Sequence, residues 1–192
     1  MIEGKRILIT GGGGFIGTAL AKLLCVNNDV TLFDLSFNNS FDYDVKNIEV
    51  VEGNILDKKA MAKVVRGSQV IIHTAAKVGV QEVINDSLST LEINYIGTSN
   101  LLKTADGSCC ERIVVFSTSE VFGANAFGVS EDSDSILTSV QDVRWCYCIS
   151  KMASEHLAFS YYRQRNLPVV VVRPFNIFGI GRVGNYAMLQ FI

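Results

Sequence analysis

A tyrosine and a lysine lie four residues apart in the stretch "RWCYCISK", which covers residues 144–151. If a helix begins here, Tyr147 and Lys151 share one face, because side chains four residues apart are neighbours on a helix. A free tyrosine has a pKa of about 10 and is a poor base, but a lysine cation nearby stabilises the phenolate. The pair could then take a proton from a substrate hydroxyl. Taken alone, the spacing also fits a surface tyrosine and a surface lysine.

The cysteines on both sides of the tyrosine raise a second possibility. Cys146 and Cys148 could bind a metal or form a strained disulfide. The chain has five cysteines, no C-x-x-C pair and two histidines, whereas zinc requires four ligands. An odd number of cysteines in a chain whose N-terminus is not typical of a signal peptide indicates reduced, mostly buried thiols. We therefore interpret both cysteines as packing residues and predict no metal site.

A glycine-rich loop near the N-terminus indicates a dinucleotide site. In "ILITGGGGFIGTAL", Gly11, Gly14 and Gly17 follow a candidate strand and open a candidate helix. Glycine at these positions permits a tight turn, lets backbone N–H groups approach a pyrophosphate, and lets helix and strand pack closely. The positive N-terminal end of the helix then faces the phosphate charge.

An aspartate that ends the next candidate strand indicates which dinucleotide would bind. The Asp34 carboxylate can accept hydrogen bonds from an adenosine ribose, although it could also merely cap a loop. A carboxylate here repels the 2′-phosphate of NADP, and the following "LSFNNS" has no arginine to bind that phosphate. We therefore expect NAD as the cofactor.

Three hydroxyl side chains and a carboxylate occur together in "FSTSEVFG". Ser117, Thr118 and Ser119 end a predicted parallel strand, which is where doubly wound sheets gather their ligands. A hydroxyl there can hydrogen-bond a substrate oxygen as it becomes a carbonyl, and Glu120 adds an acid in the same turn. Taken singly, the same residues could serve only as turn caps.

The elements that must position these residues alternate between strands and helices. Six short, almost continuously apolar runs predict strands buried on both faces of a parallel sheet, at residues 5–10, 29–34, 47–53, 69–75, 112–118 and 167–174. Helical patterns cover residues 15–26, 57–67, 87–105 and 147–165. This alternation predicts an α/β fold: a Rossmann-type doubly wound parallel sheet with helices on both faces. The polar residues 123–143 predict a long functional loop.

Composition sets broad limits on the class of protein. The 192 residues are 48% hydrophobic and 19% charged, which suits one domain with a real core. The net charge of −2, without blocks of like charge, argues against a nucleic-acid surface or a basic membrane patch. No apolar stretch approaches the roughly 18 residues of a membrane span. We expect a soluble, cytoplasmic protein.

Together these motifs resemble the extended short-chain dehydrogenase/reductase family, and more narrowly its NAD-dependent nucleotide-sugar epimerases and dehydratases. They occur in family order: the glycine loop, "HTAA" at 73–76, "STSEVFG" at 117–123, Tyr147 with Lys151, and "RPFNIFG" at 173–179. The resemblance implies an NAD-binding Rossmann domain over residues 1–175. Residues 176–192 would begin a truncated substrate-binding region, with the substrate domain largely absent from this chain.

The resemblance also implies roles for single residues. Tyr147 would take the proton from a sugar hydroxyl as hydride leaves for the nicotinamide, while Lys151 tunes it and binds the nicotinamide ribose. Thr118 would hydrogen-bond the same sugar oxygen, and Glu120 would act at C5 or beside a sugar carboxylate. The expected substrate contacts are Ser119 and Asn176, the latter at the diphosphate. Apart from the tyrosine and lysine, the cofactor would contact Gly11, Gly14, Phe15, Ile16, Gly17, Asp34, Asn54, Ile55, Ala75 and Ala76. Family members often form homodimers through the two long helices, here 87–105 and 147–164.

Two departures from the family pattern refine the expected function. Asn54 stands where many relatives have an aspartate that contacts adenine, and its side-chain oxygen can still accept that hydrogen bond. Ser119 stands where many sugar-nucleotide 4,6-dehydratases have an aspartic acid that protonates the leaving hydroxyl, which a serine cannot do. We expect an NAD-dependent nucleotide-sugar epimerase/dehydratase that acts through a 4-keto sugar. The alternatives are a UDP-glucuronate decarboxylase-like enzyme and a catalytically silent NAD-binding module or fragment.

Overall fold

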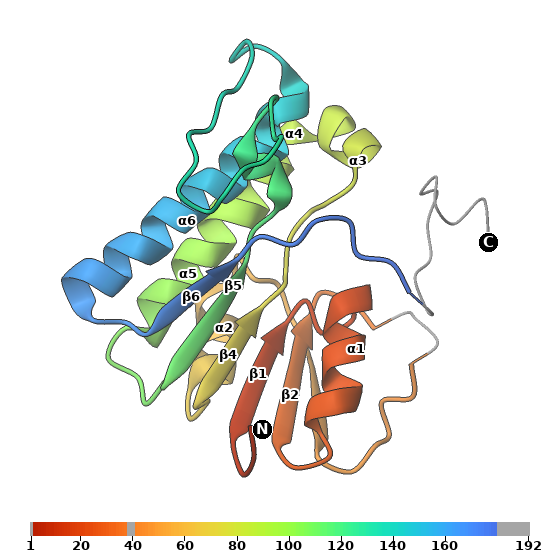
Figure 1. Cartoon of the computed structure of the whole chain (residues 1–192). Helices are drawn as coiled ribbons and strands as arrows, with labels where there is room; N and C mark the ends of the chain where they lie inside the picture. Colours follow the sequence, from red (N-terminus) through yellow and green to blue (C-terminus); the bar gives the residue numbers. More distant parts are fainter. Residues whose placement is uncertain (1, 38–40, 180–192) are drawn as a thin grey trace.

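A computed structural model describes residues 2–37 and 41–179 of the chain, which form a parallel sheet with helices on both faces (Figure 1). The order across the sheet is β3-β2-β1-β4-β5-β6, and every neighbouring pair is parallel. The strands are β1 (Arg6–Thr10), β2 (Asp29–Asp34), β3 (Ile48–Glu52), β4 (Val70–His73), β5 (Arg112–Phe116) and β6 (Val169–Val172). The predicted doubly wound fold is confirmed, and each strand lies within its predicted range.

Two apolar clusters fix the helices to the sheet. Ile7 and Ile9 of β1 belong to a buried cluster with α1 (Phe15–Leu24) on one face. Leu8, which points the other way because strand side chains alternate, belongs to the cluster on the opposite face. That second cluster takes in α2 (Lys58–Val65), α5 (Gly97–Ala105) and α6 (Cys146–Arg165).

The expected helix over residues 87–105 is not uniform. It consists of α4 (Ser87–Leu91), a π-helical turn η1 (Glu92–Ile96) and α5, so the predicted segment is helical throughout, with a π turn at its centre that the sequence pattern did not indicate. A π turn inserts an extra residue into the turn and often occurs at functional sites. The fully buried Asn94 lies in this π turn. A short helix, α3 (Val80–Asn85), precedes α4 and was not predicted.

The segment 123–143 is irregular, as its composition predicts. An isolated bridge joins Gly123 to Ile136, and the Phe127 side chain in the loop is 98% exposed. The loop is flanked by two short 3-10 turns, η2 (Ser119–Phe122) and η3 (Val143–Trp145). The loop therefore connects the end of β5 to the beginning of α6.

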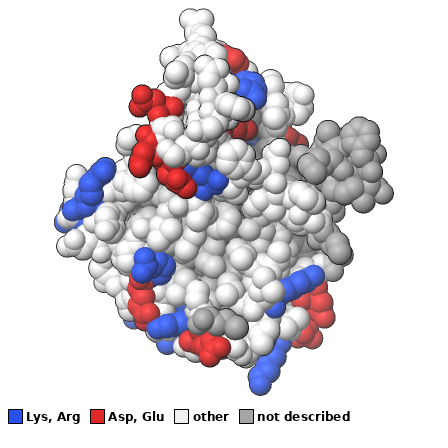
Figure 2. All heavy atoms as spheres, viewed as in Figure 1, with Lys and Arg blue, Asp and Glu red and all other residues white. Residues whose placement is uncertain are grey.

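Charged side chains of both signs are interspersed over the face shown in Figure 2, mostly around its periphery. Within the described ranges, no helix is both long and apolar enough to cross a membrane. Most of the predicted beginning of a substrate region, residues 180–192, lies outside the described residues.

The strand order creates a crevice at the carboxyl edge of the sheet. β1 and β4 are neighbours, but the chain continues from β1 towards β2 and from β4 towards β5. The connections therefore diverge at this point, and such a switch point is where open parallel sheets bind ligands. All of the residues singled out above for chemistry follow the carboxyl ends of strands or begin the adjacent helices.

Gly17→Ala should destabilise the chain. A methyl group at Gly17 would lie 2.2 Å from the carbonyl oxygen of Gly11 and 2.8 Å from the Cα of Gly12, and backbone atoms cannot rotate away. We expect the free energy of unfolding in urea to fall by about 1–3 kcal/mol, the usual cost of overpacking. The control is Gly179→Ala, whose new methyl group would lie 3.4 Å from the Phe15 ring, an ordinary contact. Equal stabilities of the two variants would contradict this packing argument.

Candidate active site

Two adjoining cavities occupy the crevice at the carboxyl edge of the sheet. The first, of about 490 Å³, runs along the glycine loop and is called here the glycine-loop cavity. The second, of about 350 Å³, contains the tyrosine and lysine and is called the tyrosine cavity. Four residues line both cavities, which therefore meet: Ile16, Thr74, Ala76 and Val78.

The glycine loop contacts the segment after β4 too closely for a side chain. A methyl group on Gly11 would lie 2.6 Å from the backbone nitrogen of Ala75, and the φ of Gly11 is +76°. The helix α1 begins after Gly14 with no side-chain cap and no acidic residue in its first turn. The positive end of the helix dipole is therefore not compensated by an acid of the helix itself, which suits an anion at this end.

The far end of the glycine-loop cavity presents polar oxygens suited to an adenosine. Asp34, at the end of β2, accepts hydrogen bonds from the backbone N–H groups of Gly13 at 2.9 Å and Leu35 at 2.7 Å. The Asn54 Oδ1 accepts one from the N–H of Leu56 at 2.9 Å. Each oxygen acceptor has a further lone pair to offer a ligand. Ten of the twelve residues that the sequence predicts for the cofactor line this cavity, and Tyr147 and Lys151 line the tyrosine cavity instead; the ten are Gly11, Gly14, Phe15, Ile16, Gly17, Asp34, Asn54, Ile55, Ala75 and Ala76.

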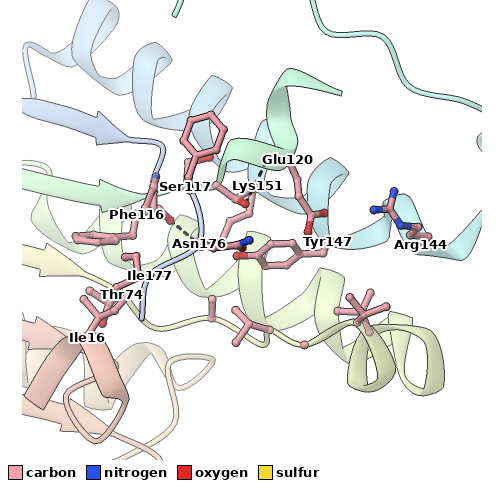
Figure 3. Close-up of a pocket in the computed structure, with 18 residues that line it drawn as sticks. Ile16, Thr74, Phe116, Ser117, Glu120, Arg144, Tyr147, Lys151, Asn176 and Ile177 are labelled. Carbon is pink, nitrogen blue, oxygen red and sulfur yellow. Dashed lines mark hydrogen bonds between the residues drawn. The ribbon is translucent and has the colours of Figure 1, made fainter. Parts of the chain in front are cut away.

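The tyrosine and lysine project from the first two turns of α6 into the tyrosine cavity (Figure 3). Tyr147 is half-buried, whereas Lys151 is only 3% exposed, and its Nζ donates to the carbonyl oxygen of Phe116 at 2.8 Å. Burial lowers the pKa of Lys151 to about 8, and the charge of Glu155 acts in the opposite direction. Lys151 is thus mostly protonated at neutral pH, and its charge favours the phenolate form of a neighbouring tyrosine.

Polar residues after β5 form another side of the tyrosine cavity. The buried Thr118 caps η2: its Oγ1 accepts from the Glu120 N–H at 3.2 Å, which leaves its own O–H to donate. Burial raises the pKa of Glu120, against a smaller effect of the Arg144 charge. Within the described ranges, Ser117 has the one buried side-chain oxygen without a hydrogen-bond partner, and Ser117 lines this cavity. A ligand in the cavity would therefore meet hydroxyl groups and a carboxyl group whose pKa is raised by burial.

The segment after β6 supplies Asn176, which lines the tyrosine cavity together with Tyr147 (Figure 3). Ser119 is placed differently. Its backbone N–H donates to the Pro174 carbonyl oxygen at 2.9 Å, and it is not among the described residues that line either cavity. Contact between Ser119 and a substrate stays a prediction.

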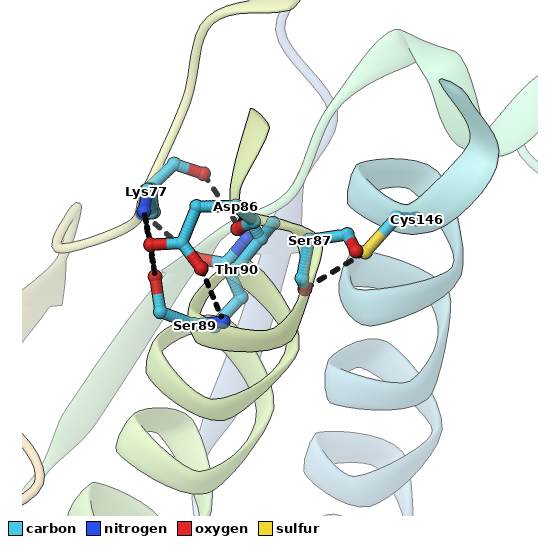
Figure 4. A network of polar contacts seen from close by, with 7 residues as sticks. Lys77, Asp86, Ser87, Ser89, Thr90 and Cys146 are labelled. Carbon is cyan, nitrogen blue, oxygen red and sulfur yellow. Dashed lines mark hydrogen bonds and ion pairs between the residues drawn. The ribbon is translucent and has the colours of Figure 1, made fainter. Parts of the chain in front are cut away.

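The two cysteines beside Tyr147 are bonded to backbone carbonyls. Cys146 Sγ donates to Ser87 at 3.2 Å (Figure 4), and Cys148 Sγ donates to Glu120 at 3.1 Å. Burial raises the pKa of both thiols, that of Cys148 to about 11. The raised pKa values make the thiolate form, which is the form that binds a metal, less accessible at both residues. The described ranges also contain no group of three or more histidine, cysteine or acidic side chains that could hold a metal.

Sequence reasoning missed Asn94, which connects the cavity wall to α6. Its side chain accepts from the Lys77 N–H at 2.8 Å and donates to the Lys77 carbonyl at 3.2 Å. It also donates to Ser150 Oγ at 3.0 Å, and that hydroxyl donates to the backbone carbonyl of Tyr147 at 2.6 Å. The available signal was weak: Asn94 stands between apolar Ile93 and Tyr95, but the same helical stretch holds other polar residues, among them Asn100.

A second network fixes the wall shared by the two cavities. The Lys77 ammonium donates to Asp86 at 2.5 Å and to the Ser89 hydroxyl at 2.6 Å (Figure 4). Asp86 caps α4 by accepting from the Ser89 N–H. Hydrogen bonds from Lys77, and then from Ser89, lower the pKa of Asp86 to about 2. Lys77, in the segment that follows β4, is thus held by its ammonium group in this network and by its backbone through Asn94.

His73, which precedes these wall residues, is buried as a neutral imidazole. Thr98 Oγ1 donates to the Asn94 carbonyl at 2.6 Å, so it can only accept from His73 Nε2, at 2.9 Å. His73 Nδ1 therefore accepts from Thr10 Oγ1 at 2.7 Å. Burial, and to a smaller degree the charge of Lys151, lowers the pKa of His73 to about 3.

The fold and the site together define a class of protein: a Rossmann-type chain that places a tyrosine and a lysine in a cavity adjoining a glycine loop. Comparison with known families gives the particular group. Residues 7–191 match the model of the NAD dependent epimerase/dehydratase family, and the chain belongs to that family. The predicted family is therefore confirmed, and the expected cofactor agrees with the family's description.

The relatives of this chain are named as enzymes that catalyse different reactions of nucleotide sugars. The chain is 38% identical over 180 residues to the UDP-N-acetyl-alpha-D-glucosaminuronate decarboxylase of Bacillus cytotoxicus, covering 91% of this chain and 55% of that one. A dTDP-glucose 4,6-dehydratase from Streptomyces venezuelae, solved with NAD bound, is 30% identical with a TM-score of 0.82, covering 97% and 60%. A UDP-glucuronic acid 4-epimerase from Bacillus cereus, in complex with UDP-glucuronic acid and NAD, is 26% identical with a TM-score of 0.83, covering 96% and 63%. The chain spans about half the length of the curated relatives it matches.

Acid should destabilise the chain through His73. An unfolded histidine titrates near 6.5, so between that value and about 3 only the unfolded chain binds this proton. The free energy of unfolding should therefore fall as the pH decreases below about 6.5, by about 2 kcal/mol from this residue between pH ~7 and ~5. Urea unfolding at the two pH values measures the loss. His73→Gln should show a correspondingly smaller loss, whereas replacement of the exposed His156 by Gln should keep the wild-type loss. The same pH dependence in all three proteins would contradict the prediction.

Proposed function

We propose that this chain carries the NAD-binding and catalytic part of a nucleotide-sugar epimerase/dehydratase that oxidises the sugar at C4. The observation that carries the proposal is the presence of Thr118, Tyr147 and Lys151 in one cavity that adjoins the glycine-loop cavity. Membership of the NAD dependent epimerase/dehydratase family supports it. So do relatives named as enzymes of nucleotide sugars.

The residues present fit an NAD molecule laid along the two cavities. Asp34 and Asn54 would hold the adenosine end, and the uncapped N-terminus of α1 would face the pyrophosphate. The lysine ammonium would bind the nicotinamide ribose beside the tyrosine. Ser117, with its unpartnered hydroxyl, is a further donor at this end. When bound, NAD would supply the hydride acceptor for the sugar carbon.

The side chains of the tyrosine cavity would move the proton. Tyr147 as the phenolate takes the proton of the C4 hydroxyl, and the charge of Lys151 keeps the phenolate accessible at neutral pH. Thr118 donates a hydrogen bond to the same oxygen as it becomes a carbonyl oxygen. Asn176 would contact the diphosphate of the substrate. Ser119 would contact the part of the substrate that lies close to Glu120. Returning the proton from Tyr147 completes the cycle.

The chain divides, in this proposal, into an NAD-binding domain at residues 1–175 and the beginning of a substrate-binding region at 176–192. Coverage of about half of the relatives' length supports this division. We further propose a cytoplasmic homodimer whose subunits meet through the helices of residues 87–105 and 147–164. The partially exposed apolar side chains along the first of these, Leu88, Leu91, Tyr95 and Ile96, support that interface.

Decarboxylation of a nucleotide-linked uronic acid is the second candidate. Ser119 cannot serve as the acid of a dehydratase, whereas Glu120 lines the tyrosine cavity together with the cation of Arg144. A cation at this place suits a substrate carboxylate. The 38% identity to a decarboxylase of a UDP-linked uronic acid agrees with this candidate.

Proton NMR of the products should separate these outcomes. With NAD and a panel of UDP-, GDP- and TDP-sugars, the protein at its natural length should convert at least one sugar. A product with inverted configuration at C4 identifies an epimerase. A 4-keto-6-deoxy sugar identifies a dehydratase, and a pentose identifies a decarboxylase. If the protein binds NAD and converts none of these sugars, the silent NAD-binding module becomes the better account.

Tyr147→Phe should abolish turnover without loss of the cofactor. Phenylalanine keeps the ring but removes the group that accepts the proton, so the rate should fall about 10²–10⁴-fold. Binding of NAD, followed by calorimetry, should remain within a few-fold of wild type. Tyr162→Phe is the matched control, because Tyr162 lies on the same helix and is 56% exposed. Turnover by Tyr147→Phe at the rate of the control would contradict the mechanism.

A further inference from the structure

The helix that carries the tyrosine and lysine also buries a carboxylate. Glu155 lies one turn after Lys151 on the same face of α6, and it is 4% exposed. A carboxylate removed from water is costly unless other groups pair with it. Glu155 is outside the set of residues that line the tyrosine cavity, so substrate binding does not account for it.

An arginine from the segment after β6 pairs with this carboxylate through two parallel hydrogen bonds. Arg173 Nε lies 3.0 Å and Nη2 lies 2.7 Å from the two different oxygens of Glu155. This fork geometry fixes the position of the carboxylate as well as its charge. The pair therefore links α6 to the chain segment that continues to Asn176 in the tyrosine cavity.

The arginine itself is held on two further sides. Its Nη1 donates to the carbonyl oxygen of Glu131 in the long loop at 2.9 Å. Its guanidinium lies over the Phe122 ring, 5.2 Å from the ring centre, at the end of η2. Arg173 thus has little freedom to turn away from Glu155, and the carboxylate stays beside the lysine.

The charges around Lys151 give this carboxylate a specific role. The neighbouring His73 is neutral, and the lysine ammonium donates to the uncharged carbonyl oxygen of Phe116. Glu155 is the acidic group whose charge counteracts the effect of burial on the lysine. The other titratable or charged groups that face this region are Tyr147, Glu120 and Arg144 in the cavity, Cys148 on α6, and Arg173, Glu131 and Asp132 behind Glu155.

We propose that Glu155 is a positioning residue for the active site: held in place by Arg173, it supplies the negative charge that keeps the buried Lys151 ammonium protonated beside Tyr147. The proposal rests on the proposed function only in treating Lys151 as catalytic. A purely structural ion pair would tie α6 to the segment after β6 without acting on the lysine. The two accounts differ in what happens when each partner is replaced separately.

The test measures the titration of Lys151 by NMR, without cofactor or substrate. The chain is labelled with ¹³C at the lysine ε-carbons, and the Lys151 signal is assigned by its absence in Lys151→Arg. Glu155→Gln should move the titration midpoint of Lys151 to lower pH by roughly one pH unit, because the attracting charge is gone. Arg173→Gln breaks the same ion pair but leaves the carboxylate, so it should move the midpoint to higher pH.

Opposite shifts in the two variants are the signature that a structural role alone would not produce. Glu111→Gln, which breaks the Lys5–Glu111 ion pair elsewhere in the fold, is the control and should leave the midpoint unchanged. Should a single variant fail to fold, the double variant Glu155→Gln/Arg173→Gln replaces it, with a midpoint expected between wild type and Glu155→Gln. An unchanged midpoint, or shifts of the same sign in both single variants, would overturn the proposal. Because no turnover is measured, this result is independent of whether the sugar chemistry proposed above is correct.

Discussion

A lysine ammonium buried at the carboxyl edge of the sheet is the constraint on which the site depends. Removing such a charge from water favours its neutral form, and Lys151 accordingly has its pKa lowered to about 8. The charge persists at neutral pH because Phe116 offers a carbonyl oxygen at 2.8 Å and Glu155 lies one turn away. A second cation next to it would be costly, and the neighbouring His73 is held as a neutral imidazole between two threonines.

The topology of the sheet explains why these groups can meet. Strands β1, β4, β5 and β6 are parallel neighbours, so the segments that leave their carboxyl ends all emerge at one edge. The glycine loop contacts the exit of β4 because no side chain intervenes at Gly11. The exit of β5 supplies Thr118, the exit of β6 supplies Asn176, and the beginning of α6 places Tyr147 between them. Residues distant in sequence thus share one cavity.

Much of the fold and the outline of the site could be predicted from local patterns. Apolar runs indicate the strands because both faces of a parallel sheet are buried, and the glycine and Tyr147-x-x-x-Lys151 spacings are short-range. What the sequence did not reveal depends on contacts between distant segments. The buried Asn94 in the π turn bonds to Lys77 and Ser150, and the pairing of Glu155 with Arg173 crosses from α6 to the end of β6. Ser119 has a suitable side chain, yet its placement away from the lining of the cavities is set by the η2 turn.

The most direct test of the central claim follows the hydride itself. The protein at its natural length is loaded with NAD and mixed with nucleotide sugars that carry deuterium at C4, and the cofactor is then analysed by mass spectrometry. In reactions stopped before the first cycle is complete, the account predicts reduced cofactor that carries one deuterium, because the sugar carbon that loses its hydroxyl proton to Tyr147 also gives up its hydride, which returns to the sugar only later in the cycle. Turnover of the sugar without any deuterium passing through the cofactor would contradict oxidation at C4.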